Sequence, residues 1–413
     1  MLQATRYFDS FSKDERDRRW QRVREFMKNK GLDGLVVVGF RYGEPLDRYL
    51  SNWIPGCIVI FPLEAPPTLL ARMIPEMFAL RSDMPEKDRP WIEDIRPGIQ
   101  GGAIITVLRE KGLDRSRVGV VGTDTLRTDW GGWIPFRTWN RVVSGLPECS
   151  FEDATAAFAE LVLVKSDEEL VQVRQAAQVL ELACKEMVKT VRSGVTELEV
   201  YSTIQSVLSK NGVYAPNLIL RSGPDNISWG QPPWLFGVGS PRILEPGDIV
   251  QAEIFAWCGG LEAQVQMSVA IPPVSSANNK CAQLARQTYE EGLQHLKAGK
   301  KFAEVVAAME AVLDSPGVWH LTPLIHSMNP MVCIGPTGVG IESLPGVEAY
   351  RQVGTSRIRG ADIVLEPGMV FELEPNACIK RHRVNIGGTV IVTERVAEPL
   401  NQLSTEMRLA GEA

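Results

Sequence analysis

The sequence contains few of the residues that hold metal ions or form disulfide bridges. Its seven cysteines are odd in number and scattered singly, so that no CxxC pair occurs: Cys57, Cys149, Cys184, Cys258, Cys281, Cys333 and Cys378. This distribution argues against a disulfide framework or a zinc knuckle. Only four histidines are present: His295, His320, His326 and His382. The scarcity limits how many imidazole groups any active site can use.

Long apolar runs and an excess of basic residues are also missing. No run approaches the roughly 20 apolar residues that span a bilayer, and the polar start "MLQATRYFDSFSKDERDRRW" lacks the apolar core of a signal peptide. The formal net charge of −6 does not favour binding to nucleic acid or to an anionic membrane. We therefore expect a cytoplasmic protein whose partner is a small molecule.

The length and the change of pattern near residue 155 predict two domains. A chain of 413 residues is too long for one ordinary core. In residues 1–155, a predicted helix over 14–31 ends at Gly31 and precedes short strands and helices, as in an α/β domain. In residues 156–413, Ser166 and Glu169 form a capping-box pattern at the start of a long helix. Further helices are predicted from Thr196, over 276–298 and over 302–314, with strands between them, as in an α+β domain.

One internal repeat is visible in the second domain. The segments "LEPGDIVQAEIFA" (244–256) and "LEPGMVFELEPNA" (365–377) each place a glutamate nine residues after the leucine, at Glu253 and Glu374. Two half-domains related by a pseudo-twofold axis would bring these glutamates together. The alternative is coincidence, because a Pro-Gly turn followed by a strand is common.

Each repeat strand is followed by a partner strand. After Glu253 the chain turns at Gly259-Gly260, and the alternation in "LEAQVQMSVAI" puts four polar residues on one face: Glu262, Gln264, Gln266 and Ser268. After Glu374 the partner is "VNIGGTVIVTE".

The second partner strand carries Gly387 and Gly388 in its middle, where glycine weakens a strand. The predicted floor of the site is Glu253, Gln264 and Glu374, and Gly387 stands where a fourth group would lie.

These motifs resemble those of the creatinase/aminopeptidase P/prolidase (M24) family, which includes methionine aminopeptidase. Five of them occur in the family's order: "RSGPDNISW", "LEPGDIV", "GPTGVGIE", "LEPGMVFELEP" and "GGTVIVTE". The resemblance begins earlier, with "LDRYLSNWIPG" and "LVKSDEELVQVRQAA", and covers nearly the whole chain. It implies an α/β N-terminal creatinase-like domain (1–155) and an α+β pita-bread C-terminal domain (156–413) with pseudo-twofold symmetry.

The same resemblance implies that most metal ligands of the family are missing. Its peptidases hold two metal ions with Asp, Asp, His, Glu and Glu, and the corresponding positions are Glu253, Gln264, Thr337, Glu374 and Gly387. A second family histidine corresponds to Cys333. Because hard divalent cations prefer several anionic oxygen ligands, we expect no metal cofactor. The glycine would leave room for substrate. The alternative is a single metal kept by compensating groups such as Glu262, Cys258 or His326.

A site without metal can act directly on a substrate that carries positive charge. Glutamates bind guanidinium, amidinium and ammonium groups, and the family includes a creatinase that acts on a guanidino compound without metal. We therefore predict a metal-independent hydrolase, or a related C–N bond-cleaving enzyme, for a small nitrogenous substrate. Glu253, Glu374 and Glu262 are the candidate catalytic residues, one of them as general base.

Other residues are candidates for substrate binding. Creatinase's acid/base histidine has no counterpart here, since its position falls at Gly230 or Gln231. His326 is either an active-site group or a structural histidine. Trp229 and Trp234 belong to a proline-rich loop that forms either a lid or a dimer contact. The resemblance adds Arg41, which would hold a substrate carboxylate or lie on the surface. The candidate substrate-binding residues are Gln264, Gln266, Thr337, Trp229, Gln231, Trp234, His326, Arg41 and Cys333.

Two other functions stay open at this point. One is an ordinary dimetal Xaa-Pro dipeptidase or aminopeptidase, and the other is a pita-bread domain that binds ligands without catalysis. The family resemblance also implies a homodimer.

Overall fold

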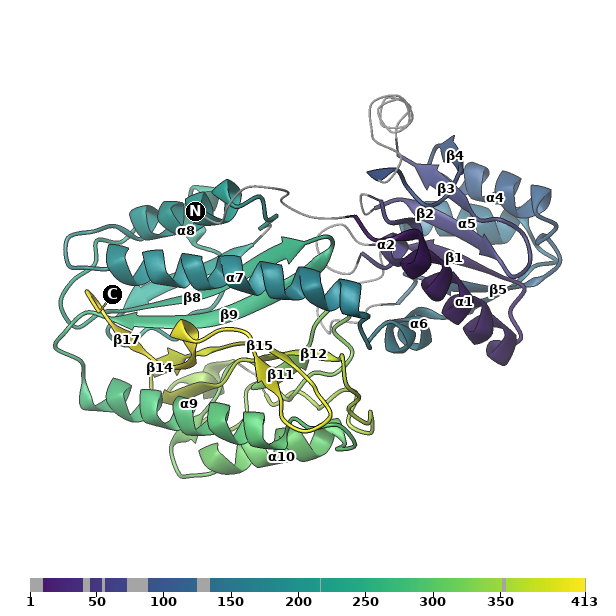
Figure 1. Ribbon diagram of the computed structural model, residues 1–413. Coiled ribbons are helices and arrows are strands. Elements are labelled where there is room, and N and C mark those ends of the chain that lie inside the picture. The colour runs from purple at the N-terminus through teal and green to yellow at the C-terminus, as the bar shows by residue number, and fades with distance from the viewer. Residues whose placement is uncertain are drawn as a thin grey trace. The chain divides into compact units, whose positions relative to one another are not determined.

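The computed structural model describes residues 10–39, 45–53, 56–72, 88–124, 134–215, 217–350 and 354–412. The chain divides into two compact units (Figure 1). The N-terminal unit comprises Phe8–Leu163 together with Asn329–Val332. The C-terminal unit comprises most of the remaining chain, Val164–Met328 and Cys333–Ala413. The predicted pair of an α/β domain and an α+β pita-bread domain is confirmed.

The N-terminal unit is built on a six-stranded mixed sheet in the order β4-β3-β2-β1-β5-β6. β1 pairs antiparallel with β2 and parallel with β5. The strands of this sheet are β1 (Gly34–Val38), β2 (Ile58–Pro62), β3 (Thr68–Ala71), β4 (Asp94–Pro97), β5 (Arg117–Val121) and β6 (Ser150–Asp153). The helices are α1 (Lys13–Lys30), α2 (Leu46–Ser51), α4 (Gly101–Glu110), α5 (Phe136–Gly145) and α6 (Thr155–Leu161).

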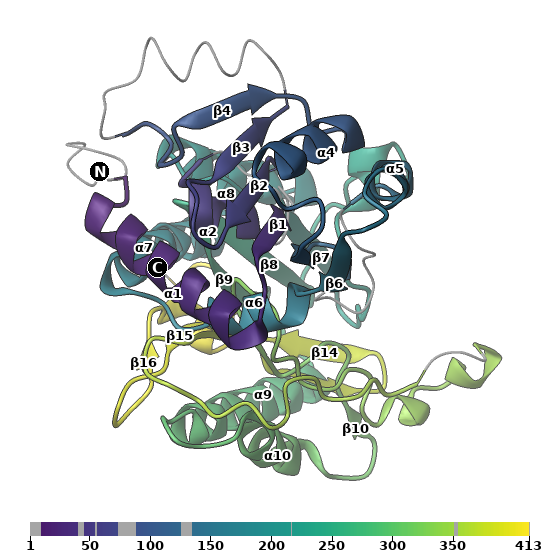
Figure 2. The same ribbon diagram turned by 90° about the vertical axis from the view of Figure 1, so that its right-hand side faces the viewer.

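The predicted first helix of this unit is confirmed, and so is its end at Gly31. The Ser12 side chain accepts a hydrogen bond from the Glu15 backbone N–H at the start of α1. Gly31 ends the helix in the left-handed conformation, with φ of 66°, which glycine adopts without strain. Figure 2 shows α1 beside the strands that follow it.

The C-terminal unit contains an eight-stranded sheet that carries the candidate site. Six of its strands follow one another in the order β11-β12-β15-β9-β8-β7, and two short strands pair with β15 and β9. These strands are β7 (Leu218–Gly223), β8 (Ile249–Cys258), β9 (Leu261–Ala270), β11 (Ile325–Ser327), β12 (Val370–Leu373), β15 (Gly387–Ile391), β16 (Glu398–Pro399) and β17 (Arg408–Leu409). A second, three-stranded sheet has the order β10-β13-β14, with β10 (Val318–Trp319), β13 (Asn376–Ile379) and β14 (His382–Asn385).

Among the described residues, the C-terminal unit has four long helices. They are α7 (Asp167–Thr190), α8 (Glu197–Lys210), α9 (Ser276–His295) and α10 (Phe302–Leu313). Figure 1 shows α7 running along β8 and β9, and α9 lying beside α10. The capping box predicted at Ser166 is present, and Thr196 forms a second one at the start of α8. Short 3₁₀ helices complete the unit at Pro233–Phe236 (η2), Ile341–Ser343 (η3), Val347–Ala349 (η4) and Leu403–Thr405 (η5).

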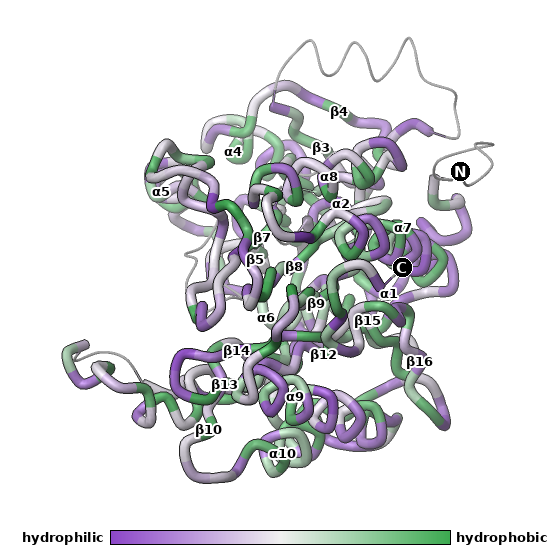
Figure 3. Tube along the Cα trace, turned by 90° about the vertical axis from the view of Figure 1, so that its left-hand side faces the viewer, coloured by the Kyte–Doolittle hydropathy of each residue, from purple (hydrophilic) through white to green (hydrophobic). Residues whose placement is uncertain are grey.

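The two faces of the large sheet differ in polarity. Along β8, residues such as Ala252, Ile254 and Ala256 point to one face and are completely buried. Glu253 alternates with them and points to the other face. Hydrophobic and hydrophilic segments likewise alternate along α9, as amphipathic packing requires (Figure 3). Within the described residues, no helix has the length and apolar character needed to cross a membrane.

Candidate active site

The two repeat glutamates lie in one row across the large sheet. Glu253 on β8 pairs with Gln266 on β9, and Gln266 pairs with Gly387 on β15. Since Leu373 pairs with Gly388, Glu374 continues the row opposite Gly387. Residues opposite one another in an antiparallel pair share a face. The repeat therefore places Glu253 and Glu374 on the same face with one glutamine and one glycine between them.

A second row of polar residues runs beside the first. His326 on β11 pairs with Glu372 on β12, and Glu372 pairs with Thr389 on β15. The Thr389 hydroxyl donates to the Gln264 carbonyl and accepts from the Gln264 N–H, both at 2.9 Å. The predicted common face of Glu262, Gln264, Gln266 and Ser268 is confirmed by the register of β9 against β8.

Side-chain amides bind two of the carboxylates on this face. Gln266 donates from Nε2 to Glu374 Oε2 at 2.7 Å, and its own Oε1 accepts from Asn385 Nδ2 at 3.0 Å. Gln264 donates from Nε2 to Glu262 Oε1 at 2.9 Å. Of the residues of the predicted floor, Gln264 lies on the same face as Glu253 and Glu374 but in the neighbouring row, and Gln266 lies between the two glutamates.

Four buried glutamates lie in this floor or close to it. Glu253, Glu262, Glu372 and Glu374 are exposed by 7% or less. Burial raises the pKa of Glu372 well above its ordinary value, and the charges of the other three glutamates raise it further. Glu372 therefore holds a proton under conditions in which an exposed glutamate is ionised. The cluster avoids the full repulsion of four negative charges in this way.

His326 also belongs to the cluster. Its Nε2 lies 3.5 Å from Glu374 Oε1, and its Nδ1 lies 3.0 Å from the Ser327 carbonyl oxygen. A carbonyl only accepts, so Nδ1 carries a hydrogen and Nε2 faces the carboxylate. His326 and Glu374 are thus placed to exchange a proton.

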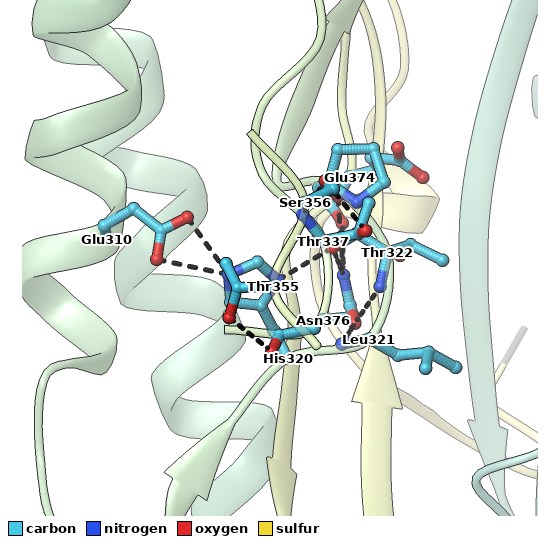
Figure 4. A network of polar contacts seen from close by, with 11 residues as sticks. Glu310, His320, Leu321, Thr322, Thr337, Thr355, Ser356, Glu374 and Asn376 are labelled. Carbon is cyan, nitrogen blue, oxygen red and sulfur yellow. Dashed lines mark hydrogen bonds and ion pairs between the residues drawn. The ribbon is translucent and has the colours of Figure 1, made fainter. Parts of the chain in front are cut away.

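The backbone around Glu374 is held by Asn376. The buried Asn376 accepts at Oδ1 from the backbone N–H groups of Leu321 and Thr322, at 2.8 and 3.2 Å. Its Nδ2 lies 3.3 Å from the Glu374 carbonyl oxygen, and the Glu374 N–H donates to the Leu324 carbonyl at 2.9 Å. Figure 4 shows this network, which continues to His320 and Glu310. This network fixes the backbone of Glu374, which directly follows β12, and so the direction of its side chain.

Gly387 does not leave room for substrate, contrary to the expectation from sequence. A Cβ atom on Gly387 would lie 1.8 Å from the Leu373 carbonyl oxygen and 3.1 Å from Glu374 Cα. The glycine has φ of 139°, which other residues rarely adopt. Backbone fills the volume, so this position accepts no side chain.

The residues at the family's metal positions do not fit a pair of metal ions. Gln264 presents a neutral amide that donates to Glu262, Gly387 has no side chain, and the Thr337 hydroxyl donates to Ser356 at 3.0 Å. In the described part of the chain, no group of three or more His, Cys, Asp or Glu side chains is arranged to hold a metal ion. Cys258 offers no compensation, because it lies on the opposite face of β8 and donates to Gln175 at 3.4 Å.

The remaining sequence candidates lie in several environments. Cys333 is buried beside β11, where its N–H donates to the Ser327 hydroxyl at 3.0 Å. Gln231 donates to Asn217 at 2.7 Å. Trp234 stacks edge-on against Tyr201 and donates to Glu197 at 3.1 Å, both on α8. These contacts of Gln231 and Trp234 do not support the prediction that they bind substrate, whereas Trp229 lies over Arg383. Arg41 falls outside the described residues.

Sequence reasoning missed three residues that contact or influence the cluster: Glu372, Arg383 and Asn385. The signal for Glu372 was present, because it precedes Glu374 by two residues and therefore shares its face if the strand continues. Arg383 and Asn385 are likewise two residues apart, on β14, and therefore share a face. Their positions against Trp229 and Gln266 depend on how β14 packs, which no spacing reveals.

Comparison with known proteins agrees with the geometry. The model of metallopeptidase family M24 matches residues 171–394. A creatinase from Bacillus sp. is 23% identical, with 92% of this chain and 87% of the relative covered. An Xaa-Pro dipeptidase from Pyrococcus furiosus is 21% identical, with 62% and 68% covered.

A solved structure shows the same fold over almost the entire length. The X-Pro aminopeptidase from Thermotoga maritima superposes with a TM-score of 0.72 at 17% identity, covering 94% of this chain and 99% of that one. The family match spans more than half of the chain. The protein therefore belongs to metallopeptidase family M24, in which creatinases and prolidases are its relatives.

Proposed function

We propose that this member of the M24 family is a metal-independent hydrolase that cleaves a C–N bond in a small, cationic nitrogenous substrate. The observation that carries the proposal is the pair Glu253 and Glu374, which share a face while the family's other metal positions hold groups that bind metal poorly or not at all. Carboxylates arranged in this way match guanidinium, amidinium or ammonium groups.

The chain's own residues suggest how the reaction proceeds. One of the two repeat glutamates binds the cationic nitrogen. The His326–Glu374 pair, 3.5 Å apart, takes a proton from the attacking water and returns one to the leaving nitrogen. His326 thereby fills the acid/base role for which sequence reasoning found no residue in the Trp229 loop. Gln266 holds the Glu374 carboxylate in place through its 2.7 Å hydrogen bond.

A direct test combines metal analysis with substrate screening. Purified protein is analysed for metals and assayed, with and without EDTA, on guanidino compounds, amidines, amides and Xaa-Pro dipeptides. We expect turnover of one cationic class that EDTA does not change, and a fall of about 10²–10⁴-fold in Glu374→Gln, as loss of an acid/base group produces. The control is Glu394→Gln, which alters an exposed residue.

An Xaa-Pro dipeptidase activity is the second candidate. It is supported by the dipeptidase relative and by the aminopeptidase fold, and opposed by the donor set described above. About two bound metal ions per chain, as a dimetal mechanism requires, together with EDTA-sensitive dipeptide hydrolysis, would replace the first proposal by this one. A binding domain without catalysis is indicated if no compound is turned over and both glutamate-to-alanine variants are simply more stable.

A further inference from the structure

The C-terminal unit contains a cavity that the proposed function does not use. It has a volume of about 740 Å³ and lies between the last turn of α10, the turn that follows it, β10 and the segment that includes η3. Its walls combine apolar side chains, among them Val318 and Val339, with the carboxyl groups of Glu310, Asp314 and Glu342. A cavity of this size accommodates a small organic molecule.

His320 forms part of the inner wall of this cavity and is 1% exposed. Its Nδ1 lies 2.8 Å from the Thr322 carbonyl oxygen, which only accepts, and its Nε2 lies 3.0 and 3.1 Å from the two carboxylate oxygens of Glu310. We infer that both ring nitrogens donate, so that the pair consists of an imidazolium and a carboxylate. Figure 4 shows the pair at one end of the network drawn there. The charge of Glu310 is thus balanced from inside the protein.

The other two carboxyl groups of the cavity have no such partner. Asp314 and Glu342 are exposed, and the side chain of neither forms an ion pair or a hydrogen bond with a described residue. No lysine or arginine stands among the described residues that line the cavity. Because the pair of His320 and Glu310 is neutral, the cavity keeps the two negative charges of Asp314 and Glu342.

The end of α10 adds to this negative potential. The carboxyl end of a helix carries partial negative charge, because its last carbonyl groups have no partner within the helix, and basic residues normally compensate it. The helices α1, α7 and α8 each have lysine in the last turn, whereas α10 has no basic residue there. Glu310 lies in that turn and Asp314 is the C-cap. Asp314 is therefore unfavourable for the helix unless a cation occupies the cavity beside it.

The arrangement of the acidic groups favours an organic cation over a metal ion. A metal ion needs several ligands that converge on one point, and within the described residues no group of three or more His, Cys, Asp or Glu side chains does so. The carboxyl groups instead stand around a cavity whose walls also carry the apolar side chains of Val318 and Val339. A methylene chain buries apolar surface against such walls, while ammonium groups donate to the carboxylates.

We propose that this cavity binds a small aliphatic diamine, with its ammonium groups held by Asp314 and Glu342 and its methylene chain against Val318 and Val339. None of the described residues that line the cavity belongs to the glutamate cluster of the candidate active site. The diamine site is therefore separate from the site of the proposed function and does not depend on it.

The test uses the full-length protein, putrescine as the diamine, and titration calorimetry at constant ionic strength. The cavity variant Asp314→Asn/Glu342→Gln removes both unpaired charges. The charge-matched control is Glu348→Gln/Glu394→Gln, which removes two carboxyl groups from exposed residues that do not line the cavity. The variant Glu374→Gln reports any diamine that binds in the glutamate cluster instead. Butylamine, which has one ammonium group, and Mg²⁺ are the comparison ligands.

We expect putrescine to bind the wild type, the charge-matched control and Glu374→Gln with the same affinity at the cavity. The cavity variant should bind it about 10-fold more weakly, as the loss of two ion pairs at a partly enclosed site allows. Butylamine should bind the wild type about 10-fold more weakly than putrescine, and the cavity variant should abolish that difference. Because both substituted residues are exposed, the melting temperature of the cavity variant without ligand should equal that of the control.

Four results would overturn the proposal. The wild type binds no putrescine up to about 10 mM, the weakest affinity that a specific site would have; the charge-matched control loses as much affinity as the cavity variant; Mg²⁺ displaces putrescine at equal ionic strength, which indicates diffuse attraction; or only Glu374→Gln loses binding. If the cavity variant alone loses putrescine and the protein turns over no cationic substrate, the diamine site stands and the proposed function fails.

Discussion

The Leu373 carbonyl oxygen lies where a Cβ atom on Gly387 would be, at 1.8 Å from the ideal position of that atom. β12 and β15 therefore touch backbone to backbone beside Glu374. The family resemblance implies a metal-bridging glutamate at the position of Gly387, and the contact with Leu373 leaves no volume for a side chain there. The neighbouring carboxylates interact with amides and with His326.

The first prediction concerns the stability of this contact. Gly387→Ala should lower the free energy of unfolding by more than about 3 kcal/mol, because an unfavourable φ and backbone overlap both oppose the side chain. Gly346→Ala is the matched control, since Gly346 also has a positive φ, of 88°, but no atom within 4 Å of its Cβ position. Urea unfolding of both variants measures the difference. Equal losses in the two would show that φ alone is responsible and that the overlap relaxes freely.

The second prediction concerns pH and Glu372. Its pKa in the folded protein is raised above the ordinary 4.5, so the folded state binds the proton more tightly than the unfolded state does. The stability from this group is complete below pH 4.5 and is lost as pH rises through the folded pKa, by at most about 1.4 kcal/mol per pH unit. Urea unfolding from pH 5 to 8 should show Glu372→Gln gaining stability relative to the wild type as pH increases.

A carboxyl group whose pKa is shifted in the opposite direction provides the control for that series. Hydrogen bonding to Arg174 lowers the pKa of Glu398, so its contribution is present above the unfolded pKa and is lost on acidification. Glu398→Gln should therefore differ most from the wild type at neutral pH and converge with it in acid. A Glu372→Gln curve parallel to the wild type at every pH would contradict the assigned protonation.

The third prediction separates two buried histidines. His326→Asn should reduce kcat by about 100-fold or more and remove the acid/base limb of the pH profile, while changing stability little. His320 faces the Thr322 carbonyl at 2.8 Å and the Glu310 carboxylate at 3.0 and 3.1 Å, so His320→Asn should cost about 2–3 kcal/mol of stability and leave kcat intact. If both variants lose only stability, His326 is structural as well.

The fourth prediction concerns the residue that fixes Glu374. Asn376→Ala leaves the Leu321 and Thr322 N–H groups without their acceptor and should lower the free energy of unfolding by about 2–4 kcal/mol, the penalty of two buried unpaired donors. Asn211→Ala, which removes a single bond to the Val207 carbonyl near the end of α8, should lose about 1 kcal/mol or less. Denaturant unfolding compares the two. A loss no larger than the control's would mean that water replaces Asn376.

Much of the site follows from the sequence because strand periodicity is a local property. The spacing of Glu262, Gln264 and Gln266 sufficed to put them on one face, and the repeated Leu-Glu-Pro-Gly turn sufficed to bring Glu253 and Glu374 together. The capping box at Ser166 was equally readable, since its two partners lie three residues apart. In each case the determining contacts are short in sequence or repeated.

Sequence spacing is less informative where partners are distant in sequence. Gln266 and Gly387 are paired by the register of β9 against β15, which is set by tertiary packing. The same is true of Trp234, whose indole N–H is bound by Glu197 on α8, and of Gly387, whose contact with Leu373 depends on how closely two strands approach. A missing side chain indicates either space or crowding, and the sequence alone does not distinguish them.

The close backbone contact at Gly387 also limits which substitutions this position tolerates. A single substitution of Gly387 cannot introduce a carboxylate, because β12 would first have to move aside. Placing a carboxylate at this position therefore requires two coordinated changes, one in the residue and one in the path of β12. The backbone contact therefore keeps a further carboxylate out of this row more firmly than the identity of any single residue does.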